Sequence, residues 1–232
     1  RINELMDGIR QVSDNVAHDL KTPLTRLRNR LEQAEVEGAG ASRAYLPDAI
    51  AEADRLLSMF NAMLRIARIE ADAAKAFTQR VALAQVLTDV VELYEPLAEE
   101  KGVAINVDIG ATPDVLGDAD LLFQAIANVV DNAVKFSGEG ASIQVGLVSN
   151  VGGEATIRIA DAGPGIPTAE RERVFRRFYR VESSRTEQGH GLGLSLVAAV
   201  VERHRGRVWL EDNAPGLIVN MTLPIALGAR HA

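Results

Sequence analysis

The sequence has no cysteine, and aromatic residues make up only 4% of its 232 residues. The lack of cysteine excludes disulfide bonds and thiolate metal ligands, and it fits a reducing compartment. With so few aromatic rings, the core must consist mainly of Leu, Val, Ile and Ala, which suits packed helices and an open sheet. The apolar fraction of 47% is large enough for one large domain or two small ones.

Long apolar runs and long basic blocks are also missing. No segment reaches the roughly 18 consecutive apolar residues of a membrane span, and no signal peptide is visible. We therefore expect no membrane contact within these residues. The net charge of −7 and the lack of a long basic block argue against general nucleic-acid binding. The chain begins at Arg1, inside a helix-like repeat and without an initiator Met, so we expect a fragment of a longer protein.

Two stretches near the N-terminus carry apolar residues at every third or fourth position. The first runs from Ile2 to Ala34, and the second from Ile50 to Ala71, with a Gly-containing break at residues 37–42 between them. This period predicts two amphipathic helices that form an antiparallel hairpin. Because one hairpin buries its apolar faces poorly and two paired hairpins bury them well, we expect a homodimeric four-helix bundle over residues 1–75.

The periodicity lapses around residues 73–80, where we place a linker to a second domain over residues 76–232. Short apolar runs and helical patterns alternate in this part, which predicts an α/β sandwich with helices on one face of a mixed sheet. The expected strands are residues 81–83, 103–109, 142–148, 155–160, 207–211 and 217–223, and the expected helices are 85–101, 118–136 and 192–205.

His18 lies off the apolar stripe of the first helix, so it should face solvent on a rigid support. A neutral imidazole has one nitrogen with a free lone pair, and it can act as a nucleophile near neutral pH. Asp19 could hold the other ring N–H, and Thr22 shares the face of His18 one turn later. Pro23 should kink or loosen the helix there. Taken alone, the pattern also fits an ordinary exposed histidine.

Residues 118–136 carry two kinds of face. Leu122, Ile126, Val129 and Ala133 recur at helical spacing and should be buried, whereas polar side chains recur on another face. These are Asn128, Asn132 and Lys135. Amide oxygens suit Mg²⁺, and an ammonium group suits phosphate, so this face could hold a metal–triphosphate group. A solvated helix face is the alternative reading of the same residues.

Two glycine-rich segments complete the candidate site. In the first, Asp161 follows an apolar strand, where its carboxylate could accept a hydrogen bond from an adenine amino group, and Gly163 and Gly165 permit a tight backbone path. In the second, glycines at 189, 191 and 193 open a helix, where free amides and the helix dipole favour anions. The spacing matches neither the Walker nor the Rossmann fingerprint. Each segment alone also fits a simple turn.

Five segments in this order resemble the motif set of sensor histidine kinases of two-component systems. They are the H-box at His18–Leu24, the N-box at Asn128–Lys135, the G1 box at Asp161–Gly165, the F-box at Phe175–Arg180 and the G2 box at Gly189–Gly193. The second part of the chain is similar to the ATP-binding domain that these kinases share with DNA gyrase, heat-shock chaperones and mismatch-repair ATPases, which has the Bergerat (GHKL) fold.

The resemblance implies a role for each motif residue. His18 would be the phosphoacceptor and Asp19 its base, and Thr22 would support dephosphorylation of the partner. In the nucleotide site, Asn128 and Asn132 would hold Mg²⁺ and phosphates. Lys135 would contact phosphate, and Asp161 would recognise adenine. Phe175 and Phe178 would anchor a lid between Ile166 and Gly189, and Arg180 and Arg185 would stabilise charge on the transferring group. Five glycines would let the backbone approach the nucleotide closely: Gly163, Gly165, Gly189, Gly191 and Gly193.

The resemblance also implies the activity: ATP-dependent autophosphorylation of His18, transfer to an aspartate of a response regulator receiver domain, and dephosphorylation of that regulator. We expect this fragment to be cytoplasmic and the full-length protein to lie in the bacterial inner membrane. Transfer within or between subunits stays open. His190 departs from the Ser or Thr usual at its position, and both phosphate contact and no role are possible for it.

Two rival functions remain open at this stage. A conformational ATPase of the gyrase type would keep ATP turnover without His18, and a nucleotide-binding scaffold would act by docking alone. His18 and its helical hairpin argue against the first. The complete set of expected catalytic positions argues against the second.

Overall fold

The computed structural model describes residues 28, 29, 31, 39–71, 76–110, 114–150, 152–181 and 191–226. The chain divides into two compact units between Arg68 and Ile69. The candidate residues that lie outside the described residues are His18, Asp19, Thr22, Arg185, Gly189 and His190. Residues 72–75 also lie outside the described residues. The expected domain boundary at residue 75 falls among them and stays a prediction. Among the described helices, none combines the length and apolarity needed to cross a membrane.

The first described helix, α2, spans Ala39–Ala71 and contains Pro47. The predicted break at residues 37–42 is therefore wrong for its second half, because Gly40 and Ser42 lie inside the helix. A glycine costs a helix interior only about 1 kcal/mol relative to alanine. The neighbouring Ala39, Ala41 and Ala44 are strong helix formers, and they outweigh this cost.

The apolar side chains of α2 fall on two sides of the helix. Ala49, Met63, Ile66 and Ile69 are buried, whereas part of the stripe identified in the sequence remains exposed. The exposed fractions are 54% for Ile50, 61% for Leu57, 42% for Phe60 and 42% for Leu64. These four residues recur at steps of seven, three and four, which is the spacing of a helix–helix seam. A single chain thus leaves an apolar seam of α2 in contact with water.

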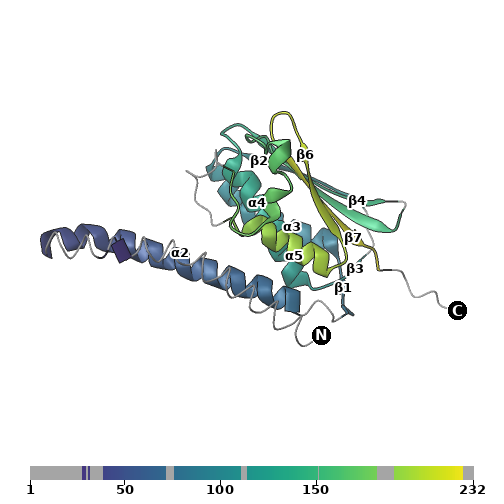
Figure 1. Cartoon of the computed structure of the whole chain (residues 1–232). Helices are drawn as coiled ribbons and strands as arrows, with labels where there is room; N and C mark the ends of the chain where they lie inside the picture. Colours follow the sequence, from purple (N-terminus) through teal and green to yellow (C-terminus); the bar gives the residue numbers. More distant parts are fainter. Residues whose placement is uncertain are drawn as a thin grey trace. The chain divides into compact units, whose positions relative to one another are not determined.

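The second unit is built on a five-stranded mixed sheet with the order β2–β4–β5–β7–β6, in which β2 and β4 are parallel and the other neighbours are antiparallel. Helices α3, α4 and α5 lie along one face of this sheet (Figure 1). The strands are β2 Ala104–Ile109, β4 Ser142–Asn150, β5 Glu154–Ala160, β6 Arg207–Asp212 and β7 Leu217–Pro224, and the helices are α3 Leu83–Glu100, α4 Ala119–Phe136 and α5 Gly193–Arg203. The expected α/β sandwich is confirmed.

A two-stranded sheet of β1 (Arg80–Val81) and β3 (Val115–Leu116) adjoins α3 in the chain. The predicted strand at residues 81–83 is partly wrong, because helix α3 already begins at Leu83. Leu83, Val86, Leu87 and Val90 are all buried, and their spacing is helical rather than alternating. Strand β3 was not predicted, since two residues are too few to show a period.

The core lies between the sheet and the three helices. Leu122, Ile126, Val129 and Ala133 are at most 2% exposed, so the predicted buried face of α4 is confirmed. From the sheet, alternate residues of β4 and β5 meet this face, including Ile143, Leu147, Ile157 and Ile159. Burying this face leaves Asn128 and Asn132 on another side of α4, where they are half-buried. Two 3₁₀ turns, η1 (Thr168–Glu170) and η2 (Arg173–Phe175), follow β5.

Candidate functional site

Helix α4 carries three of the predicted site residues. Its N-terminus is fixed by Asp118, whose Oδ1 accepts hydrogen bonds from the backbone N–H groups of Asp120 (3.0 Å) and Leu121 (3.1 Å). Aspartate is a preferred N-cap residue because its carboxylate accepts from amides that have no partner within the helix. Asn128, Asn132 and Lys135 are all half-buried, which fits side chains at the wall of a site rather than on a fully solvated surface.

The N-terminus of α5 lies against Asn128 and Asn132. A Cβ atom at Gly193, the first residue of α5, would lie 3.1 Å from Oδ1 of Asn128 and 3.8 Å from Nδ2 of Asn132. Asn128 is held by its own helix, because its Nδ2 donates to the carbonyl of Gln124 at 2.8 Å. Its Oδ1 therefore faces the start of α5, where unpaired amides favour an anion. Two predicted motifs thus meet at one place.

Asp161, directly after β5, is only 8% exposed. Its Oδ1 accepts hydrogen bonds from the backbone N–H groups of Gly163 (2.8 Å) and Leu217 (3.2 Å). Burial raises the pKa of this carboxyl above its ordinary value, and the two backbone hydrogen bonds partly oppose the increase. Among the described residues, both backbone donors reach Oδ1, which leaves the second carboxylate oxygen suited to accept a hydrogen bond from a ligand.

Glycines let the backbone pack tightly around Asp161. A Cβ at Gly163 would lie 2.8 Å from the carbonyl oxygen of Phe136, at the end of α4. Gly216 has a φ of +123°, and a Cβ there would lie 1.9 Å from the carbonyl oxygen of Asp161. Gly165 has a φ of +70° and approaches the carbonyl of Gly216 in the same way. Larger residues at these positions would displace the carboxylate.

The F-box contacts the G2 box through the backbone. Phe178 has a φ of +62°, and its N–H donates to the carbonyl of Gly191 at 2.9 Å. Gly191 has a φ of +68°, and a Cβ there would lie 2.8 Å from the carbonyl carbon of Phe178. Val174, directly before the F-box, is buried, whereas Phe175 and Phe178 are half-buried. The backbone of the F-box is therefore joined to Gly191, just before the start of α5.

The described structure brings two groups of predicted residues together. Asn128 and Asn132 meet Gly193, and Asp161 meets Gly163. Lys135 lies on α4 with its ammonium nitrogen 5.4 Å from the ring centroid of Phe136, and Arg180 is half-buried beyond Phe178.

Asn213 and Gly216 were not among the predicted site residues. In the structure, Nδ2 of Asn213 donates to the carbonyl of Asp161 at 2.7 Å, and Gly216 packs on the same carbonyl. The Asn–Ala–Pro–Gly sequence indicated a tight turn, but it held no signal that the turn would lie beside Asp161.

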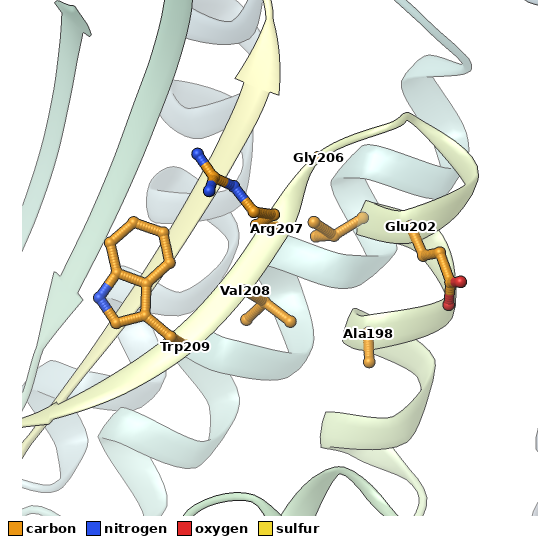
Figure 2. Close-up of a pocket in the computed structure, with 7 residues that line it drawn as sticks. Ala198, Glu202, Gly206, Arg207, Val208 and Trp209 are labelled. Atoms are coloured by element: carbon orange, nitrogen blue, oxygen red, sulfur yellow. The ribbon is translucent and has the colours of Figure 1, made fainter.

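An open groove elsewhere in this unit lies between α5 and strand β6 (Figure 2). None of the predicted nucleotide residues lines it; the lining residues are Ala198, Val201, Glu202, Gly206, Arg207, Val208 and Trp209. The indole of Trp209 points away from α5 and donates to Oε1 of Glu211 at 2.8 Å. The groove is therefore separate from the candidate site.

Comparison with known families assigns both parts of the chain. The sequence profile described as "His Kinase A (phospho-acceptor) domain" matches residues 9–72, and the profile described as "Histidine kinase-, DNA gyrase B-, and HSP90-like ATPase" matches residues 117–227. A solved structure of the mycobacterial sensor histidine kinase MprB is 34% identical, covers 63% of this chain and 96% of its own, and superimposes with a TM-score of 0.57. The chain belongs to the sensor histidine kinases.

Other members of this family are similar over more of the chain. The kinase/phosphatase MprB of Mycolicibacterium vanbaalenii is 35% identical over 216 residues, which are 89% of this chain and 43% of MprB. Full-length ShkA, solved with AMPPNP, is 29% identical with a TM-score of 0.68, covering 92% of this chain and 46% of ShkA. ThkA, solved with the response regulator TrrA, shares the fold at 19% identity, with a TM-score of 0.73 over 98% of this chain and 65% of ThkA. The chain spans about half the length of the curated relatives it matches.

Proposed function

We propose that this histidine kinase chain transfers the γ-phosphoryl group of ATP to His18. The observation that carries the proposal is the meeting of Asn128 and Asn132 with the N-terminus of α5 at Gly193. This arrangement places amide oxygens beside unpaired backbone amides, and the two kinds of group suit a metal-bound triphosphate. Among the described residues, no cluster of three or more His, Asp or Glu side chains could bind a metal instead.

Each residue of the site has a defined task in this proposal. Asp161 accepts a hydrogen bond from the adenine amino group, Lys135 neutralises phosphate charge, and Asn132 and Asn128 hold Mg²⁺ and phosphate oxygens. When bound, Mg²⁺ would neutralise charge on the phosphates and orient them. Arg180 and Arg185 of the lid stabilise the charge that develops on the transferring group. Glycines 189 and 191 let the lid backbone approach the phosphates.

The chemical step is a phosphoryl transfer. The free lone pair of the His18 ring attacks the γ-phosphorus, the bond from that phosphorus to the β–γ bridging oxygen breaks, and ADP leaves. Asp19 holds the other ring N–H and stabilises the imidazolium that forms. Positioning and charge stabilisation supply most of the rate increase.

The phosphoryl group then passes to a partner. We propose that phospho-His18 donates it to an aspartate of a response regulator receiver domain, and that Thr22 supports the reverse function, dephosphorylation of that regulator. Three findings support this: the profile over residues 9–72 is described as a phospho-acceptor domain, MprB is named a kinase/phosphatase, and ThkA was solved with a response regulator. The Thr22→Ala variant should keep autophosphorylation and lose most phosphatase activity.

The chain acts as a homodimer in this proposal. The exposed seam of α2, formed by Ile50, Leu57, Phe60 and Leu64, supports it, because four large apolar side chains at heptad-like spacing gain most when a second copy covers them. The family profile that covers residues 9–72 includes both His18 and the whole of α2.

Incubation with γ-labelled ATP tests the function directly. The wild-type chain should acquire an acid-labile label, and His18→Ala should acquire none while it keeps its affinity for nucleotide. Asn132→Ala should lose both label and affinity. Asn106→Ala is a matched control, because Asn106 is an exposed asparagine on β2, and it should behave as wild type. Label that persists on His18→Ala would overturn the proposal.

A further inference from the structure

Phe77 is the anchored side chain of the segment that leads into the ATP-binding domain. Its ring stacks on the ring of His204, with centroids 4.3 Å apart and an interplanar angle of 19°. The guanidinium carbon of Arg203 lies 3.9 Å from the centroid of the Phe77 ring. The flanking residues at positions 76 and 78–80 are exposed, whereas Phe77 is half-buried. The end of α5 thus holds this segment by one aromatic ring.

His204 connects this ring to the N-terminus of α4. Its ring is 4% exposed, and its Nδ1 lies 2.7 Å from the carbonyl oxygen of Val200. The carbonyl can only accept, so Nδ1 carries the proton and Nε2 has the free lone pair. Nε2 accepts a hydrogen bond from the backbone N–H of Asp118 at 3.0 Å. A Cβ at Gly117 would lie 2.7 Å from the His204 ring, so the backbone of α4's cap packs directly on the imidazole.

The contacted backbone belongs to the helix that carries the predicted nucleotide ligands. Asp118 caps α4, and Asn128 and Asn132 lie on the same helix. Backbone pairing reinforces the connection, because the N–H of Gly117 donates to the carbonyl of Gln79 at 3.0 Å. A continuous series of contacts therefore runs from Phe77 through His204 to Asp118.

We propose that Phe77 is a positioning residue that fixes the entering segment to the first turn of α4. Its ring, held between Arg203 and His204, keeps the His204 imidazole in place. In that place, Nε2 of His204 accepts the hydrogen bond from the Asp118 N–H. Removing the ring frees His204 to turn and weakens that hydrogen bond. The segment is then connected to the start of α4 by its backbone pairing alone. The ring contacts of Phe77 in the described part of the chain fall on Arg203 and His204, outside the predicted nucleotide residues, so its loss should change the placement of the domain rather than the affinity of its site.

The first test measures this hydrogen bond without any activity. Amide hydrogen exchange of the full chain should show the Asp118 amide exchanging on the order of tenfold faster in Phe77→Ala than in wild type. The amide of Gly110, which donates to the carbonyl of Leu147 in the sheet, serves as the internal reference and should not change. Phe77→Tyr keeps the stacked ring and should restore protection. Unchanged exchange at Asp118, or an equal increase at Gly110, would refute the proposal.

The second test concerns the reaction, and it rests on the function proposed above. Phe77→Ala should lower kcat for autophosphorylation at least fivefold, with Kd for a non-hydrolysable ATP analogue within about twofold of wild type. Thr78→Ala, an exposed neighbour on the same segment, is the matched control and should leave both values unchanged. A loss of affinity in Phe77→Ala, or an unchanged kcat, would overturn the positioning role. If wild type gains no label, the kinase proposal fails, and the exchange experiment still decides the role of Phe77.

Discussion

Replacing Asp161 by asparagine separates two effects of the buried carboxylate: the proposed recognition of adenine, and the cost of burying its charge. The side chain keeps its shape, and an amide oxygen can still accept from the N–H groups of Gly163 and Leu217, as Oδ1 does now. The other position changes from an acceptor to an NH₂ donor. It would face the adenine amino group, which is also a donor. The variant should therefore fold normally and bind ATP poorly.

The magnitude follows from the hydrogen bond that is lost. A hydrogen bond to a charged group contributes about 1.5–3 kcal/mol, and an unsatisfied buried donor adds a penalty of about 1–3 kcal/mol. A total of about 3 kcal/mol corresponds to roughly a hundredfold increase in Kd. Isothermal titration calorimetry with an ATP analogue measures this directly. Asp212→Asn is the control, because Asp212 is an exposed carboxylate that pairs with Arg171, and its affinity should not change.

Stability should respond in the opposite direction. Burial raises the pKa of Asp161, so the folded chain binds a proton more readily than the unfolded chain. Between the unfolded and folded pKa values, the free energy of unfolding therefore falls as pH rises, and the ionised carboxylate destabilises the ligand-free fold above this window. Asp161→Asn removes that dependence and should melt at the same or a higher temperature at pH 7. A variant that binds ATP as wild type does would refute adenine recognition by this carboxylate.

Three further predictions address the site, the buried histidine and the seam of α2. Gly193→Ala should raise Kd for nucleotide about tenfold by calorimetry, since its Cβ would crowd the site, whereas Gly138→Ala, with no atom within 4 Å, should not. Burial lowers the pKa of His204, helped by the charge of Arg203 and opposed by the hydrogen bond to Val200 and by Asp118. The free energy of unfolding should then fall as pH decreases below about 6.5, where the histidine of the unfolded chain takes up a proton. The melting temperature of His204→Gln should fall less than that of wild type over the same range. Leu57→Lys should convert dimer to monomer in light scattering, whereas Leu93→Lys, at a similarly exposed leucine of α3, should not.

The sequence predicted α4 well because its pattern is local. The apolar period that buries Leu122 and Ile126 also determines where Asn128 and Asn132 point, so one helix supplied both the core face and the ligand face. The start of helix α2 was predicted less well. Gly40 and Ser42 are typical of a break, but the neighbouring alanines favour a helix strongly enough to include both residues.

The environment of Asp161 could not be predicted in the same way. Leu217 and Asn213 contact it from more than fifty positions later in the chain. Their places depend on the pairing of β5 with β7, and no local period encodes that pairing. The stacking of Phe77 on His204 was missed for the same reason, since the two rings lie on segments that meet only in the folded domain.

The distance along the chain between Asp161 and Leu217 has a consequence for synthesis. Strand β7 is the last of the described strands, and its first residue, Leu217, supplies the amide that orients the carboxylate, while Gly216, just before the strand, supplies the backbone that supports it. A chain emerging from the ribosome has the whole of α4 long before it has this support. The proposed nucleotide recognition therefore becomes possible only once β7 has been synthesised, and premature termination before β7 leaves a product that cannot hold ATP in the proposed manner.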